Sequence, residues 1–190
     1  MPTLYARIPE DRVGALIGPG GRTKQAIATA TSTQIDVEGS EGEVRLVGAD
    51  TDPMSVLKAR DIVLAIGRGF SPERAMRLLA EDTFFGVLDI KLATGHHEKA
   101  ALRRIRSRVI GTHGRARTRL EQLSGCSVSV YGSTVALIGK EEQLDRATRA
   151  VELLVKGSEH STVFHLLARL KREDAAKEAT ASDDEADAGG

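Results

Sequence analysis

An internal repeat is the feature of this 190-residue sequence that most limits how it can fold. A shift of 93 residues, which places residue 16 on residue 109, superposes the segments "LIGPGG" and "VIGTHG", each with two glycines in the spacing G-x-x-G. The same shift matches apolar positions further along, such as Ile35 with Val128 and Val37 with Val130. Self-similarity at a fixed period is the signature of a duplicated structural unit. We therefore expect two copies of one small fold.

The spacing of apolar residues predicts the order β-α-α-β-β-α for each copy. In the first copy we expect a strand at 3–8, helices at 13–17 and 22–31, strands at 34–37 and 43–47, and a helix from Pro53 to Ile66. In the second copy we expect a strand at 85–92, helices at 98–110 and 115–123, a hairpin at 127–139, and a helix at 141–155. The predicted fold class is α+β, with each three-stranded sheet packed against helices.

Three further segments lie outside the repeated units. A helix is expected between the copies, an amphipathic helix with Val163, Leu166, Leu167 and Leu170 on one face follows the second copy, and the acidic end lacks apolar periodicity. The expected division is a first domain at residues 1–69, a linking helix at 70–84, a second domain at 85–157, a C-terminal amphipathic helix at 158–173 and a disordered acidic tail at 174–190.

The formal net charge of zero hides a strong asymmetry along the chain. Residues 1–52 have a net charge of −3 and residues 173–190 of −6, whereas residues 96–172 have a net charge of +8. Within the basic half, the stretch from Lys99 to Arg119 holds eight cations and no acid. A run of like charges can be a solvated helix face, but eight cations that repel one another favour a polyanionic partner.

Cysteine content and hydropathy bear on the compartment. Cys126 is the only cysteine, so an internal disulfide is excluded. The sequence contains neither a run of about 18 apolar residues nor an N-terminal apolar segment typical of a secretory signal. We therefore expect a soluble cytoplasmic protein.

Each G-x-x-G segment is expected to connect two helices, which places it at the N-terminus of the second helix. Free backbone N–H groups and the helix dipole favour an anion there, and glycine lets a phosphate approach without a Cβ in the way. Nearby cations, Arg22 and Lys24 in the first copy and Arg115, Arg117 and Arg119 in the second, strengthen this prediction. A single such segment is more often a plain turn, but its repetition in the same context favours phosphate binding.

Nucleotide-hydrolysis and hydride-transfer motifs fit these segments poorly. The phosphate loop G-x-x-x-x-G-K-[ST] would need a glycine where Leu16 stands and a lysine where Arg22 stands. The dinucleotide pattern G-x-G-x-x-G would need a third glycine where Thr23 stands. We predict no cofactor and no enzymatic activity.

"LIGPGG" and "VIGTHG", each within β-α-α-β-β-α, resemble the GxxG loops of tandem type I (eukaryotic-type) KH domains, which bind single-stranded RNA. The resemblance implies that the loops grip phosphates while an aliphatic groove receives bases. Aromatic residues make up only 3% of the chain, which disfavours modules that stack bases on Phe, Tyr or Trp. The predicted RNA-binding residues are Ile17, Gly18, Pro19, Gly20, Gly21, Arg22, Lys24, Ile35 and Val37 in the first domain, and Arg106, Arg108, Ile110, Gly111, Thr112, His113, Gly114, Arg115, Arg117, Arg119, Val128 and Val130 in the second. Val13, Leu16, Ile27, Val109 and Leu120 are further residues expected along the grooves.

The second half, "SGCSVSVYGSTVALIG" and "ATRAVELLVKGSEHSTVFHLLARLKRE", is similar to the archaeal and eukaryotic two-KH ribosome-assembly factors that accompany the small-subunit rRNA 3′-end endonuclease. This resemblance implies a role in small-subunit assembly and 3′-end rRNA maturation, with that endonuclease and an initiation-factor subunit as partners. Two alternatives stay open. One is an accessory RNA binder in mRNA regulation or exosome-type degradation, and the other is a scaffold in which one KH domain does not bind RNA.

The remaining reactive side chains predict little chemistry. His96 and His97 have no cysteine or acid cluster to complete a metal site, and His160 and His165 are not at the i, i+4 spacing of helical metal ligands. Cys126 is expected to be a small buried residue and not a nucleophile.

Overall fold

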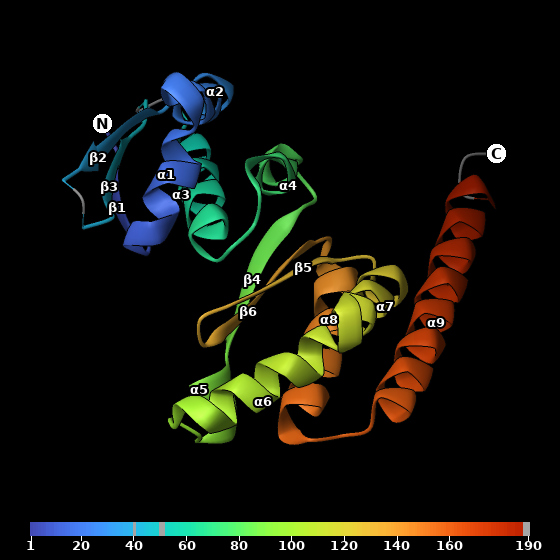
Figure 1. The fold of residues 1–190 in the computed structure, drawn as a ribbon. Coiled ribbons are helices and arrows are strands. Elements are labelled where there is room, and N and C mark those ends of the chain that lie inside the picture. The colour runs from blue at the N-terminus through green and yellow to red at the C-terminus, as the bar shows by residue number, and fades with distance from the viewer. Residues whose placement is uncertain (40, 50–51, 188–190) are drawn as a thin grey trace.

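The computed structural model describes residues 1–39, 41–49 and 52–187 and contains two three-stranded antiparallel sheets, each with helices on one face, followed by a long terminal helix (Figure 1). The fold class predicted from the sequence, α+β with two units that each pack a three-stranded sheet against helices, is confirmed. Among the described residues, no helix has the length and apolar character needed to cross a membrane.

The first unit has the element order β-α-α-β-β-α. Its elements are β1 (Thr3–Arg7), α1 (Glu10–Ile17), α2 (Arg22–Thr31), β2 (Gln34–Glu38), β3 (Glu43–Val47) and α3 (Pro53–Gly67). The strands lie in the order β1-β3-β2, and Leu4, Leu46 and Ile35 are opposite one another in the register. Leu46 and Ile35 are buried, because alternate residues of a strand face the helices. α3 begins where expected: the Asp52 side chain accepts a hydrogen bond from the backbone N–H of Ser55, and Pro53 occupies the first turn.

The second unit repeats this order with one addition. Its elements are β4 (Phe84–Asp89), α5 (Ile90–Thr94), α6 (Lys99–Ile110), α7 (Arg115–Ser124), β5 (Ser127–Tyr131), β6 (Thr134–Gly139) and α8 (Glu141–Lys156), and the strands lie in the order β4-β6-β5. The strand that we expected to reach Leu92 ends at Asp89. The Asp89 carboxylate accepts hydrogen bonds from the N–H groups of Lys91 (2.8 Å) and Leu92 (3.2 Å), so it caps the short helix α5.

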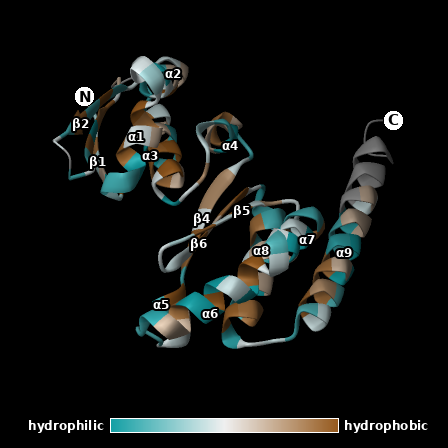
Figure 2. Cartoon of the chain, viewed as in Figure 1, coloured by the Kyte–Doolittle hydropathy of each residue, from teal (hydrophilic) through white to brown (hydrophobic). Residues whose placement is uncertain are grey.

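The two units pack closely against each other. The connecting segment holds only a short helix, α4 (Pro72–Ala75), and a 3₁₀ turn over Met76–Leu79, so it is shorter than the linking helix expected at 70–84. α3, which is rich in hydrophobic residues (Figure 2), belongs to the same core cluster as Ala136 and Ile138 of β6. The end of the first unit and the linking segment therefore pack against the outer face of the second sheet, where Ser129 donates a hydrogen bond to the carbonyl of Arg68 (2.8 Å). The outer face of the first sheet is open, and Tyr5 on it is 71% exposed.

The terminal helix α9 (His160–Asp187) lies against α7 and α8, with Val163 and Leu167 fully buried. We expected disorder from residue 174 onward, but the helix continues to Asp187. Asp174 pairs with Arg146 of α8, whose side chain is only 11% exposed. Alanine, the strongest helix former, is the commonest residue in 175–187, and Arg169 pairs with Glu173 at 3.5 Å across one turn just before this segment. Lack of an apolar stripe therefore did not prevent helix formation here.

Candidate nucleic-acid interface

Residues Gly18–Gly21 (the first glycine loop) and Gly111–Gly114 (the second glycine loop) share one backbone conformation. The first residue of each has φ/ψ of 71°/175° and 73°/174°, and the last has 77°/8° and 75°/10°. Each loop therefore kinks the chain in the same way between a helix that ends and a helix that begins. The sequence repeat extends to the conformation of these loops.

The glycines of each loop have two different roles. A Cβ built on Gly18 would lie 2.2 Å from Oγ1 of Thr23, and one built on Gly111 would lie 2.6 Å from Cβ of Ala116. Glycine at these positions lets the loop pack on the start of the next helix. At Gly21 and Gly114 nothing lies within 4 Å of a built Cβ, so the loop is open on that side. An incoming group could approach the backbone there.

His113 is in a left-handed conformation, with φ 52° and ψ 28°, at the position that Gly20 holds in the first loop. Histidine tolerates this region better than most residues, but the conformation still costs roughly 1–2 kcal/mol. Such strain is found preferentially where a chain clamps a ligand. In both loops the last glycine donates its backbone N–H to the carbonyl of the first, Gly21 to Gly18 (3.1 Å) and Gly114 to Gly111 (3.2 Å).

The cations divide into two groups. Arg115, Arg117 and Arg119 (the three α7 arginines) form no ion pair with a carboxylate of the described chain, and Arg115 and Arg119 are exposed. The Nε of Arg117 is buried without a hydrogen-bond partner in the described structure. In the first unit, Arg22 is exposed and Lys24 is half-buried.

Arg106 and Arg108, by contrast, bind main-chain carbonyls. Arg106 donates to the carbonyl of Gly132 at the tip of the β5–β6 hairpin (3.1 Å), and Arg108 donates to the carbonyls of Gly157 (2.6 Å) and Ser158 (2.9 Å) between α8 and α9. These two arginines hold other segments of the second unit in place, so the charge available at the loop comes mainly from the three α7 arginines.

The aliphatic residues predicted to line the grooves differ in exposure. Fully buried members belong to the two core clusters, and these are Leu16, Ile27, Ile35, Val109, Leu120 and Val128. Half-buried members are Val13, Ile17, Val37, Ile110 and Val130. Only the half-buried group presents surface that a base could contact, so the buried group can shape a groove but not line it.

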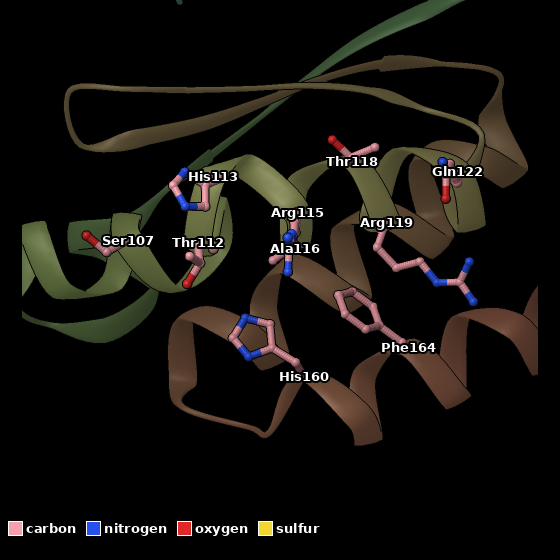
Figure 3. A pocket seen from close by; sticks show the side chains of 11 residues that line it. Ser107, Thr112, His113, Arg115, Ala116, Thr118, Arg119, Gln122, His160 and Phe164 are labelled. Atoms are coloured by element: carbon pink, nitrogen blue, oxygen red, sulfur yellow. The ribbon is translucent and has the colours of Figure 1, made fainter.

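A hollow of about 770 Å³ lies beside the second glycine loop, between α7 and α9 (Figure 3). His160 and Phe164 extend from α9 toward the loop, and Arg115 and Arg119 border the hollow on the α7 side. We refer to this space as the α9 hollow. Phe164 was not among the residues predicted from the sequence to bind RNA, and His160 was predicted to have no function. Their separation by four residues, beside the apolar stripe of the same helix, is the signal that could have found them.

The surroundings of Cys126 and Tyr131 shift the pKa values of these two side chains. Burial raises the pKa of the Cys126 thiol to about 12, which fits a small buried residue. A hydrogen bond to the carboxylate of Asp11, across the boundary between the two units, raises the pKa of the Tyr131 hydroxyl. Within the described residues, no group of three or more His, Cys, Asp or Glu side chains could hold a metal ion.

Comparison with known families identifies both units. Residues 84–172 match the eukaryotic-type KH domain (KH-domain type I), and residues 3–65 match the KH domain. The chain is 41% identical over 165 residues to a KH domain-containing protein of Methanocaldococcus jannaschii, and the match covers 86% of this chain and 71% of that protein.

Solved structures match nearly the whole chain. Dim2p from Pyrococcus horikoshii is 46% identical with a TM-score of 0.83, and the match covers 89% of this chain and 99% of that one. The P. horikoshii complex of a/eIF2alpha, aDim2p and rRNA contains a chain 45% identical with a TM-score of 0.85, covering 90% and 95%. A protein of unknown function from Aeropyrum pernix is 37% identical with a TM-score of 0.91, covering 95% and 96%.

Proposed function

This chain belongs to the family of type I KH-domain proteins, and we propose that it binds single-stranded RNA in small ribosomal subunit assembly, at the 3′ region of the small-subunit rRNA. Its similarity to Dim2p and to the aDim2p chain of an rRNA complex supports this proposal. The proposal keeps the first KH domain at residues 1–69 and the second at 85–157.

One observation carries the proposal: the two glycine loops have the same open conformation, and the second is followed by arginines without carboxylate partners in the described chain. A phosphate at the second loop would meet the open backbone at Gly114 and the positive end of the α7 dipole. The three α7 arginines would neutralise neighbouring phosphates. Half-buried Ile110 and Val130 would contact bases in the second groove, and Ile17 and Val37 would do so in the first.

The protein acts in this proposal as a binder and not as a catalyst. It would hold the rRNA 3′ region in a single-stranded state and present it to the endonuclease that cuts it, in the cytoplasm. An initiation-factor alpha subunit is the second proposed partner, supported by the presence of a/eIF2alpha in the complex of the related aDim2p.

Titration with four RNAs tests this function. They are a single-stranded RNA with the 3′ sequence of small-subunit rRNA from the source organism, the same bases in scrambled order, the first sequence as a duplex, and an unrelated mRNA segment. We expect the first to bind most tightly and the duplex most weakly, because a groove of this kind receives unpaired bases. Equal affinity for all single strands would contradict the rRNA assignment and favour a general accessory RNA binder. Failure of every RNA to bind would favour a protein scaffold.

A further inference from the structure

The α9 hollow lies on a different side of α7 from the predicted base groove. Arg115, Thr118, Arg119 and Gln122 line it, and their spacing of three and four residues places them on one face of the helix. Arg117 is on the opposite face, and Leu120 is in the core. The hollow and the groove meet at the second glycine loop, whose Gly111, Thr112 and His113 line the hollow, so a strand that crosses the loop would reach both.

His160 and Phe164 form an aromatic wall on the α9 side of the hollow, and the described residues of the first unit have no equivalent of it. A hollow of about 700 Å³ borders the first glycine loop, and the described residues that line it come from the loop and α2 alone, without an aromatic ring among them. In the second unit α9 closes the corresponding side with His160 and Phe164. The repeat therefore provides an internal comparison: the aromatic wall is an addition to the second unit, and the repeated fold does not require it.

The wall has an aromatic surface held in a fixed orientation. The ring centroids of His160 and Phe164 are 5.9 Å apart and the rings are tilted by 46°. Nε2 of His160 lies 2.7 Å from the carbonyl oxygen of Arg108, and since a carbonyl can only accept, Nε2 carries the proton and donates. This bond fixes the orientation of the imidazole. Phe164 is half-buried, packs on the core with part of its surface and lines the hollow with the rest.

We propose that the α9 hollow binds one additional nucleotide of the same RNA strand, next to the nucleotides that the second glycine loop holds. Its base would stack on Phe164 beside His160, and its phosphate would lie between Arg115 and Arg119. Aromatic side chains bind any base through its π-face, and arginine binds phosphate with a planar fork of donors. The volume, about 770 Å³, is in the range of sites for small ligands. This inference rests on the proposed RNA binding and extends the site beyond the roughly four nucleotides that the GxxG loop of a KH domain clamps.

RNA length and the side chain at position 164 test the proposal together. The RNAs are a four-nucleotide strand and two six-nucleotide strands, extended by two nucleotides at the 5′ or at the 3′ end, with 2-aminopurine in the extension. We expect one extension to raise affinity for the native protein about tenfold, in line with one base stacked on an aromatic ring, and its fluorescence to be quenched on binding. Phe164→Leu should remove the gain and the quenching while leaving affinity for the four-nucleotide RNA unchanged.

Leucine retains apolar contact with the core, so the melting temperature of Phe164→Leu should be close to that of the native protein. Phe164→Ala serves as a second, less conservative variant. His165→Ala, at an exposed position of the same helix, is the matched control and should bind every RNA as the native protein does. Equal binding of the extended RNAs by native protein and Phe164→Leu would overturn the inference and leave the proposed function standing. If Phe164→Leu lost the same affinity for the four-nucleotide and the six-nucleotide RNAs, the inference would also be overturned, since Phe164 would then support the second glycine loop and not bind an additional base. If no RNA bound the native protein, the proposed function itself would fail.

Discussion

Two aspartates in the second glycine loop should abolish most RNA binding without unfolding the protein. Thr112 and His113 are both exposed, and no described carboxylate pairs with the three α7 arginines that follow them. The double variant Thr112→Asp/His113→Asp places two negative charges where we propose that phosphates bind. His113 already has a positive φ, a conformation that aspartate also tolerates.

The magnitude follows from Coulomb's law. Two unit charges 4 Å apart interact by about 1 kcal/mol in bulk water and by about 4 kcal/mol at an effective dielectric of 20. The loop is exposed, so the lower value is the safer one, and two carboxylates then cost about 2 kcal/mol, or roughly a thirtyfold loss of affinity. Stability should change by no more than about 0.5 kcal/mol, because surface substitutions rarely exceed this and because acids are favourable at a helix N-terminus.

RNA titration and thermal unfolding of the same preparations measure both effects. Thr112→Asn/His113→Asn is the matched control, since asparagine has nearly the shape of aspartate without its charge, and it should retain affinity within a few-fold. If the aspartate variant bound RNA with native affinity, the loop would be a turn between helices and not a phosphate-binding site. An equal loss in the asparagine variant would show that shape, and not charge, had been disturbed.

Three further predictions concern the same region. Replacing the three α7 arginines with alanine should weaken binding to all RNA sequences alike. The slope of log affinity against log salt should become less steep by about 2, since each lost phosphate contact contributes about 0.7. A changed sequence preference at unchanged affinity would contradict this prediction. Denaturant unfolding should show that Gly111→Ala lowers the free energy of unfolding by at least about 1 kcal/mol more than Gly114→Ala. Both variants strain a positive φ, but only Gly111→Ala places a Cβ against Ala116. Equal losses of stability would refute the packing role of Gly111. Cys126, with its pKa raised to about 12 by burial, should react with a thiol reagent at pH 8 only when the protein is unfolded, and rapid labelling of the native protein would contradict its burial.

The parts of the fold that were predictable from sequence depend on local patterns. The order β-α-α-β-β-α in each copy followed from apolar spacing, and the positions of both glycine loops followed from the repeat. Apolar spacing is read within a few residues of the element it determines, and the repeat finds the same pattern a second time, 93 residues further along. The short helix α5 was missed because one side chain, Asp89, ends a strand that still looks apolar and begins a helix.

The parts that were not predictable depend on contacts between distant segments. Sequence spacing could not show that Arg106 and Arg108 bind carbonyls 26 and 49 residues away, or that Leu16 and Val109 lie in the core and not on a groove surface. The wall formed by His160 and Phe164 requires knowing that α9 lies against α7. Side-chain position relative to another element is a property of tertiary packing, and the pattern along one segment does not contain it.

The core cluster that α3 shares with the second sheet has a consequence for how the chain folds during synthesis. Ala136 and Ile138 complete the core cluster that contains α3, yet they are made about 70 residues after that helix ends. The first KH unit therefore leaves the ribosome with an uncovered apolar surface, although all of its own elements have been synthesised. Part of its core is completed only when β6 has emerged, and this couples the folding of the first unit to that of the second.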